Sequence, residues 1–220
     1  MNTFEEPFVS ALFSVTSHHP FQVPKEYEGV FPKGTLPIHQ CIGYTDMALK
    51  KFFEEAKKSD WYDNTLFIIT ADHSVPSHYP EYKTNINGFA VPLFFYTPNG
   101  TLLGIDEDPA QQSDILPTVL NLVGYPNGFV AFGNDLMAKD KVEDRFVMNY
   151  TNESYQFIKG DYVYYFDGQE IVAYYNYKED NFLKNNLKGT VDPSKEALQL
   201  MKAFIQQYIN RMIENELTVN

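Results

Sequence analysis

Residues 65–74 read TLFIITADHS, a short run of apolar and β-branched residues that ends directly in an aspartate and a histidine. A run of this length and composition is typical of a buried β-strand. Ligands of open α/β sheets bind at the carboxyl ends of the strands, so Asp72 and His73 would stand where chemistry takes place. A carboxylate oxygen and an imidazole nitrogen held side by side can bind one divalent cation. The two residues alone leave a second interpretation open, in which Asp72 caps the following turn beside a surface histidine.

A second apolar run, FVSALFSVT at residues 8–16, is also predicted to be a buried strand, and the polar sequence SHHPF follows it. If both strands belong to one parallel sheet, their carboxyl ends meet at the same edge. His18 would then lie close to Asp72 and His73, where an imidazole can hold a phosphate or sulfate oxygen or donate a proton. His19 is interpreted as a residue that packs in the loop.

Strands and helices alternate over the first two thirds of the chain. Apolar spacing predicts a helix over about 37–58, a strand over 89–96, and a helix over 111–123 that Gly124 ends. This alternation predicts an α/β fold with a mostly parallel sheet covered by helices. Asp114 falls at the start of the last helix, where a capping role explains a carboxylate and a place near a metal is the weaker interpretation.

The pattern changes near residue 145. Short aromatic-rich segments such as RFVMNYT and DYVYYFDG follow one another closely, which predicts an antiparallel meander. Residues 193–217 then carry apolar side chains at i, i+3 and i+4 spacing, as in a long amphipathic helix. The sequence therefore predicts an α/β part over 1–144 and a part with antiparallel strands and a terminal helix over 145–220, packed on the same domain.

Composition argues against several classes of function. The chain carries 17 Lys and Arg against 29 Asp and Glu, a formal net charge of −12, so no nucleic-acid partner is expected. The single cysteine, Cys41, excludes an internal disulfide framework and is interpreted as a packing residue. There is no G-x-S-x-G, phosphate-loop or dinucleotide-binding motif. The sequence contains no run of 18 apolar residues, which a membrane-spanning helix would need. The chain itself is therefore expected to be soluble.

Five motifs in order along the chain resemble those of the sulfatase and alkaline phosphatase superfamily, most closely its lipoteichoic acid synthase-like phosphoglycerol transferase branch. The motifs are FSVTSHHPF at 13–21, YTDMAL at 44–49, NTLFIITADHS at 64–74, VPLFFYTP at 91–98 and SDILPTVL at 113–120. Any one of them is weak, whereas five in this order and spacing are specific. The resemblance covers residues from about 7 to 137 and fits the C-terminal half of the family's catalytic domain.

The resemblance implies roles for the residues at the two strand ends. In that family the pair matching Asp72 and His73 binds a divalent cation, typically manganese, with magnesium, calcium or zinc as alternatives. The histidine matching His18 contacts the substrate phosphate. The implied fold is a mixed, mostly parallel sheet between helices, with a smaller C-terminal antiparallel part.

The resemblance also implies residues that this sequence does not contain. Family members have an N-terminal half that supplies the nucleophile, a threonine or a modified cysteine, together with a further acidic metal ligand and membrane helices. No threonine here fits the nucleophile position, and Cys41 does not stand in the C-x-P-x-R context of sulfatases. We therefore expect a C-terminal portion with no catalytic nucleophile of its own, inactive by itself, whose partner is the missing N-terminal half.

By resemblance, the complete protein would carry out metal-dependent phosphoryl-type transfer from an anionic phosphodiester, such as a lipid headgroup, on the extracytoplasmic face of a bacterial membrane. A covalent intermediate would form and pass to an alcohol or to water. Two alternatives stay open. One is a sulfatase or phosphohydrolase that releases sulfate or phosphate from an ester. The other is a binding module that keeps the fold without the reaction.

Overall fold

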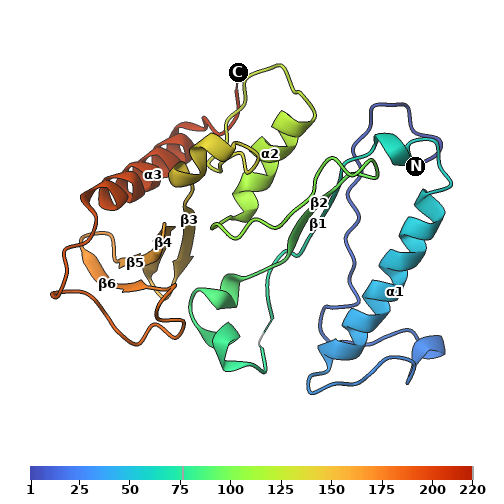
Figure 1. Cartoon of the computed structure of the whole chain (residues 1–220), viewed down its shortest axis with the longest axis horizontal. Coiled ribbons are helices and arrows are strands. Elements are labelled where there is room, and N and C mark those ends of the chain that lie inside the picture. The colour runs from blue at the N-terminus through green and yellow to red at the C-terminus, as the bar shows by residue number, and fades with distance from the viewer. Residues whose placement is uncertain (76, 220) are drawn as a thin grey trace. The chain divides into compact units, whose positions relative to one another are not determined.

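The structure is a computed structural model that describes residues 1–75 and 77–219 (Figure 1). The chain divides into two compact units, Met1–Gly104 and Ile105–Asn220, and each is described by itself. The first unit contains helix α1 (Ile38–Ala56) and strands β1 (Phe67–Thr70) and β2 (Leu93–Tyr96). The second contains helix α2 (Ile115–Leu122), strands β3 (Val147–Thr151), β4 (Ser154–Lys159), β5 (Tyr162–Phe166) and β6 (Ile171–Asn176), and helix α3 (Lys195–Glu214).

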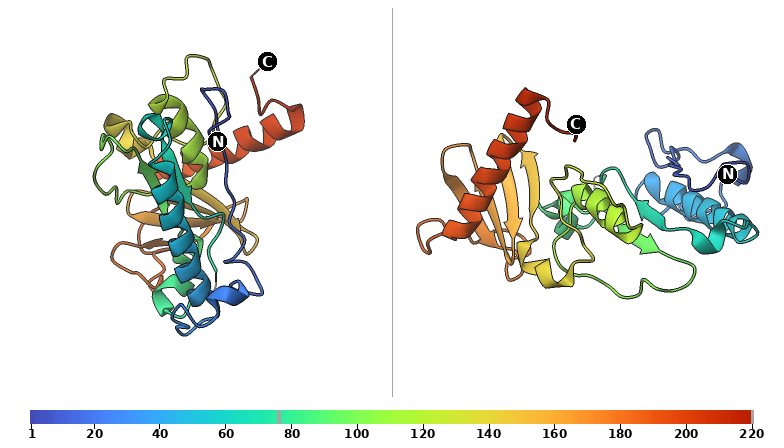
Figure 2. Two further views of the ribbon diagram at one scale, coloured as in Figure 1. Left: turned by 90° about the vertical axis from the view of Figure 1, so that its right-hand side faces the viewer. Right: turned by 90° about the horizontal axis from the view of Figure 1, so that it is seen from above.

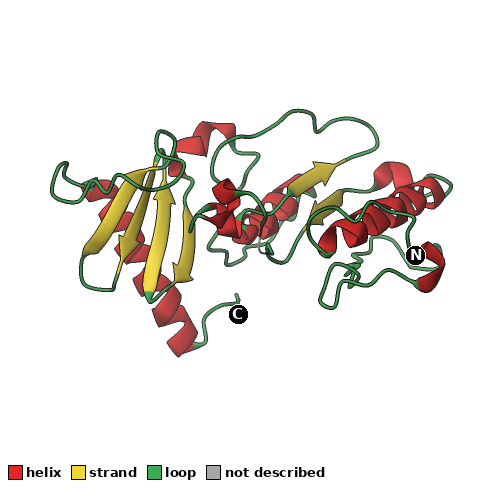
Figure 3. Ribbon diagram, turned by 90° about the horizontal axis from the view of Figure 1, so that it is seen from below, coloured by secondary structure: helices red, strands yellow, loops and turns green. Residues whose placement is uncertain are grey.

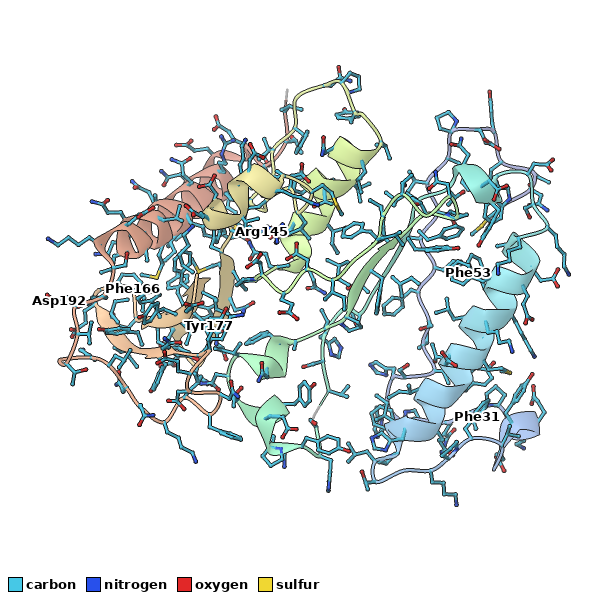
Figure 4. The ribbon with its side chains drawn as sticks, in the orientation of Figure 1. Phe31, Phe53, Arg145, Phe166, Tyr177 and Asp192 are labelled. Carbon is cyan, nitrogen blue, oxygen red and sulfur yellow. The ribbon has the colours of Figure 1, made fainter. Side chains whose placement is uncertain are left out.

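Helix α1 forms where the apolar spacing predicts it, and its aromatic side chains pack against the strand pair. The ring of Phe53, labelled in Figure 4, lies with its centroid 5.0 Å from that of Phe67 on β1 and 5.8 Å from that of Tyr96 on β2. Aromatic pairs at such distances add to the stabilisation that comes from burial alone. This contact places β1, and hence the residues that follow it, against a rigid helix.

Strands β1 and β2 pair antiparallel, with Phe67 opposite Tyr96 and Thr70 opposite Leu93. The sequence predicts a mostly parallel sheet, yet all strand pairings among the described residues are antiparallel. The reason lies in the connection: residues 71–75 and 77–92 form two short 3₁₀ turns and no α-helix. Parallel neighbours usually need a helical crossover, whereas a chain that turns back through a loop returns antiparallel.

Residues 8–16 form no strand, so the prediction from their composition is wrong for this structure. Val9 is fully exposed, and Leu12, Phe13 and Val15 are 71%, 74% and 64% exposed. No backbone hydrogen bond joins residues 9–14 to any residue that the structure describes. A strand exists only where a neighbour pairs its backbone groups, and a β-prone composition does not supply that neighbour.

In the second unit, β3, β4, β5 and β6 pair in sequence order as an antiparallel meander, as predicted. Helix α3 lies across one face of these strands (Figures 2 and 3). Ser194 caps this helix, because its side chain accepts a hydrogen bond from the backbone N–H of Ala197 at 3.2 Å. The core includes Phe146, Phe157, Tyr164, Phe166, Ile171, Tyr174, Ala197 and Met201. The meander and the terminal helix are present, while the predicted domain division at 144/145 stays a prediction.

Asp114 precedes helix α2 and is fully buried, in the capping role that the sequence favours. Its Oδ2 accepts a hydrogen bond from the backbone N–H of Gln111 at 2.8 Å, and its Oδ1 accepts one from that of Asn134 at 2.6 Å. Burial raises the pKa of the Asp114 carboxyl, and both hydrogen bonds act in the opposite direction. The carboxylate therefore ties the start of α2 to the segment that returns beside it.

Candidate metal and substrate site

Asp72 and His73 follow β1 after one residue, Ala71, and both side chains are exposed, 56% and 67% respectively. The backbone N–H of His73 donates to Oδ1 of Asp72 at 2.9 Å. The second carboxylate oxygen, Oδ2, lies 3.5 Å from Nε2 of the His73 ring. The strand end thus holds an oxygen and a nitrogen donor atom close together at the surface.

The His73 ring is oriented by its other nitrogen. Nδ1 lies 2.7 Å from the carbonyl oxygen of Ser74. A carbonyl oxygen can only accept a hydrogen bond, so Nδ1 carries the proton and, in the neutral ring, Nε2 keeps its lone pair. Histidines that bind metal ions are commonly held in this way, by a hydrogen bond from the nitrogen that does not bind the metal.

The two donor atoms have a separation that suits a shared cation. Ligand atoms about 2.1 Å from a cation lie about 3.0–3.4 Å apart at neighbouring tetrahedral or octahedral positions. The observed distance from His73 Nε2 to Asp72 Oδ2 is 3.5 Å. Within residues 1–75 and 77–219, no group of three or more His, Cys, Asp and Glu side chains is arranged to hold a metal ion. The pair can fill two positions of a coordination shell that needs at least four.

Ser74 is a supporting residue that the sequence does not single out. Its carbonyl oxygen accepts the hydrogen bond that orients His73, and its hydroxyl donates to the carbonyl oxygen of Gly88. Ser74 therefore links the ring of His73 to a loop 14 positions further along the chain. The only signal for it in the sequence is its place directly after Asp72 and His73, since nothing marks Gly88 as its partner.

His18 is exposed and lies in a tight turn of the first unit. Its Nδ1 is 2.9 Å from the carbonyl oxygen of His19, which can only accept, so Nδ1 of His18 carries a proton, as in His73. The turn closes through the backbone N–H of Phe21, which donates to the His18 carbonyl at 2.9 Å. Phe21 has a φ of 61°, an unfavourable conformation for a bulky residue. These hydrogen bonds of His18 stay within residues 15–21, and its convergence with Asp72 and His73 stays a prediction.

Two other residues with reactive side chains have structural roles. Cys41 is fully buried on α1, and desolvation raises the pKa of its thiol, as expected of a packing residue rather than a nucleophile. His39 accepts a hydrogen bond through Nδ1 from the backbone N–H of Thr35 at 3.0 Å, close to the first turn of the same helix. Neither residue belongs to the site at the end of β1.

The model of the sulfatase family matches residues 1–125, more than half of the chain, and the chain belongs to this family. Within it, the chain is similar to lipoteichoic acid synthases. It is 28% identical over 160 residues to lipoteichoic acid synthase 1 of Bacillus subtilis, which covers 64% of this chain and 25% of that protein. It is 27% identical over 176 residues to the Staphylococcus saprophyticus lipoteichoic acid synthase, and this match covers 72% of this chain and 26% of that protein. The chain spans about a quarter of the length of the curated relatives it matches.

Solved structures show the same fold. A protein in the alkaline phosphatase superfamily from Vibrio parahaemolyticus has a TM-score of 0.82 at 21% identity, over 100% of this chain and 52% of that chain. The structure of Ps i-CgsB has a TM-score of 0.60 at 18% identity, over 91% of this chain and 49% of that chain. These likenesses confirm the predicted α/β, alkaline phosphatase-like fold. Among the described residues, no helix has both the length and the apolar character needed to span a bilayer.

Proposed function

We propose that this chain is the metal-binding and phosphate-binding part of an enzyme that transfers a phosphoryl-type group from a phosphodiester, as phosphoglycerol transferases do. The observation that carries the proposal is the 3.5 Å separation of His73 Nε2 and Asp72 Oδ2, with the ring oriented by Ser74. The similarity to lipoteichoic acid synthases favours a phosphodiester over other esters. The sulfatase family match supports ester chemistry in general.

Each residue has a defined part in this proposal. Asp72 and His73 would hold the cation, for which manganese is proposed and magnesium, calcium or zinc are the alternatives. A cation bound there would lower the pKa of a hydroxyl nucleophile and neutralise charge on the phosphoryl oxygens. His18 would contact an oxygen of the substrate phosphate through its imidazole ring. Ser74 fixes the ring of His73 through its backbone.

The nucleophile and the remaining metal ligands are proposed to come from polypeptide outside these 220 residues. Two protein ligands leave the other positions of a divalent cation's shell to water or to further side chains, and a phosphoryl-transfer enzyme also needs an activated nucleophile. We therefore propose that the chain turns over no substrate by itself and works with an N-terminal half like that of its relatives. A lipid headgroup is the proposed substrate class, on the extracytoplasmic face of a bacterial membrane.

A second candidate function is hydrolysis of a sulfate or phosphate ester with water as acceptor. The match to the sulfatase family model is the observation that favours it. The two functions share the metal pair, so Asp72 and His73 do not separate them. They differ in the ester that is cleaved and in the group that accepts it.

The test is a turnover assay on a chimera in which this chain replaces the matched segment of Bacillus subtilis lipoteichoic acid synthase 1. We expect manganese-dependent cleavage of an aryl phosphodiester by the chimera and none by the chain alone. Asp72→Ala should abolish this turnover, whereas Asp63→Ala, which removes an exposed carboxylate elsewhere in the same unit, should not. Faster cleavage of an aryl sulfate would favour the second function. If the chimera folds and binds metal but shows no turnover, the chain is a binding module and not part of a working transferase.

A further inference from the structure

Asparagine followed by glycine occurs three times in the chain, at residues 87–88, 99–100 and 127–128. Asparagine is a thermolabile residue, and it deamidates fastest before glycine, which has no Cβ to hinder its own backbone nitrogen. In that reaction the backbone nitrogen of the glycine attacks the side-chain amide carbon of the asparagine. The three pairs are chemically alike, so a difference in reactivity between them has to come from the fold.

The first pair is held by two hydrogen bonds that the reaction would have to break. The backbone N–H of Gly88 donates to the carbonyl oxygen of Thr84 at 2.9 Å. Nδ2 of Asn87 donates to the carbonyl oxygen of Glu81, also at 2.9 Å. Attack requires that the Gly88 nitrogen lose its proton and that the Asn87 side chain turn toward it. Because both groups are free only when the segment opens locally, the fold slows the reaction here.

The second pair lies in a turn that restrains the same two groups. The backbone N–H of Gly100 donates to the carbonyl oxygen of Thr97 at 3.0 Å. Oδ1 of Asn99 accepts hydrogen bonds from the backbone N–H and the hydroxyl of Thr101, at 3.1 and 3.0 Å. Asn99 is exposed, so hydrogen bonding and not burial restrains this pair.

The third pair lies in the loop that follows α2, and both of its residues are exposed. Neither Asn127 nor Gly128 makes a hydrogen bond to any residue that the structure describes. A Cβ at Gly128 would meet no atom within 4 Å, so the space beside the glycine is open as well. The Gly128 nitrogen can therefore reach the Asn127 side chain without the loss of any hydrogen bond.

We propose that Asn127 is a site of spontaneous deamidation in the folded protein, and that the fold protects Asn87 and Asn99. The deprotonated backbone nitrogen of Gly128 attacks Cγ of Asn127, a C–N bond forms, and the side-chain nitrogen leaves as ammonia after it takes up a proton from water. Water then opens the resulting succinimide at either carbonyl, which gives aspartate or isoaspartate at position 127. Water is the only co-reactant, and each event replaces a neutral amide by a carboxylate.

The protection of Asn87 matters for the candidate site at the end of β1. The carbonyl oxygen of Gly88 accepts a hydrogen bond from the Ser74 hydroxyl, and the Ser74 carbonyl oxygen orients the ring of His73. An isoaspartate at position 87 would add a methylene group to the backbone directly before Gly88 and would shift this acceptor. The fold thus protects the pair that supports the candidate site and leaves the pair after α2 reactive.

The first measurement is peptide mapping by mass spectrometry after the full chain is incubated in mildly alkaline buffer. In the folded chain, the Asn127 peptide should gain one mass unit and split into aspartyl and isoaspartyl forms about tenfold or more faster than the Asn87 and Asn99 peptides react. In the chain unfolded by urea, the three rates should agree within about threefold, because no hydrogen bond then restrains any pair. Equal rates in the folded chain, or a faster reaction at Asn87 or Asn99, overturn the proposal.

The second measurement uses Gly128→Ala, because a methyl group has room at this position in the folded chain but hinders attack by the nitrogen beside it. This variant should deamidate at Asn127 about fivefold or more slowly than the wild type, while the rate at Asn99 stays unchanged. Gly88→Ala is the matched control, since a Cβ there also meets no atom within 4 Å, and it should leave the rate at Asn127 unchanged. If Gly128→Ala reacts at Asn127 as fast as the wild type, the Gly128 nitrogen is not the attacking group and the proposal is wrong.

Discussion

His73 Nε2 lies 3.5 Å from Oδ2 of Asp72, while the backbone N–H of His73 donates to the other oxygen of the same carboxylate at 2.9 Å. One carboxylate therefore holds the backbone of its neighbour and presents its second oxygen beside that neighbour's ring. Because the Ser74 carbonyl oxygen accepts from Nδ1, the nitrogen beside Asp72 is the one that keeps a lone pair in the neutral ring. These two contacts hold the donor atoms beside each other, and the proposed cation site rests on that arrangement.

Ser74→Ala tests the support of the His73 ring. The change removes the hydroxyl that donates to the Gly88 carbonyl, and we expect it to lower the free energy of unfolding by about 0.5–1.5 kcal/mol. Loss of this tie should also weaken manganese binding by about tenfold, as for other residues that orient metal ligands. Chemical denaturation and a manganese titration measure the two effects. Ser10→Ala, at an exposed position, is the control and should change neither quantity.

Gly133 lies where no other residue fits. A Cβ atom at this position would stand 2.2 Å from the carbonyl oxygen of Ser113, so Gly133→Ala forces backbone atoms apart at the start of α2. We expect destabilisation by about 1–3 kcal/mol, the range for overpacked sites. Gly128→Ala is the control, because no atom lies within 4 Å of a Cβ at that position. Its free energy of unfolding should stay within about 0.5 kcal/mol of the wild-type value. Equal denaturant midpoints for the two variants would contradict this packing.

Arg145, labelled in Figure 4, is a buried cation with two acceptors. Its side chain is 3% exposed and donates to Asp106 Oδ2 at 2.7 Å and to the Leu136 carbonyl at 2.6 Å. Arg145→Ala should cost about 1.5–3 kcal/mol, because the charge-assisted hydrogen bonds to Asp106 and to the Leu136 carbonyl are lost. The exposed pair of Lys188 and Glu170, 3.2 Å apart, is the comparison, and Lys188→Ala should cost less than about 1 kcal/mol. Thermal unfolding measures the stability of both variants. If Arg145→Ala destabilises the protein no more than Lys188→Ala does, Arg145 has no structural role.

The buried carboxyl of Asp114 should make stability depend on pH. Because burial raises its pKa in the folded state, the folded protein binds this proton more tightly than the unfolded chain does. The contribution of Asp114 is then fully present below its unfolded pKa of about 3.9 and is lost as the pH rises through the higher folded pKa. The difference in unfolding free energy between wild type and Asp114→Asn, measured by denaturation from acid to neutral pH, should therefore shrink with rising pH. A difference that grows with pH would show that the two backbone hydrogen bonds outweigh burial.

Local signals in the sequence predicted much of the fold. The 3.6-residue spacing of Leu49, Phe52, Phe53 and Ala56 predicted α1, and the closely spaced aromatic segments after residue 145 predicted the meander. The pairing of β1 with β2 depends on how the chain returns between them, so spacing alone did not give its direction. The segment 8–16 shows the same limit, since a strand requires a partner that no local pattern can supply.

The candidate site could be predicted in part for similar reasons. Asp72 and His73 are neighbours in sequence and follow a strand, so their proximity was readable from the chain. The tie from Ser74 to Gly88 spans 14 positions and depends on the course of a loop, which residue types do not determine. The convergence of His18 with the pair depends on two separate segments meeting in space, and it remains a prediction.

The most direct test of the central claim is a manganese titration of the full chain followed by NMR of the histidine rings. Paramagnetic broadening should appear first at His73, and Asp72→Ala should weaken the apparent affinity at least tenfold, whereas Asp63→Ala should leave it unchanged. The ring of His39 serves as the internal reference for non-specific binding. If His73 broadens no earlier than His39, or broadens equally in Asp72→Ala, then Asp72 and His73 do not share a cation and the account is wrong.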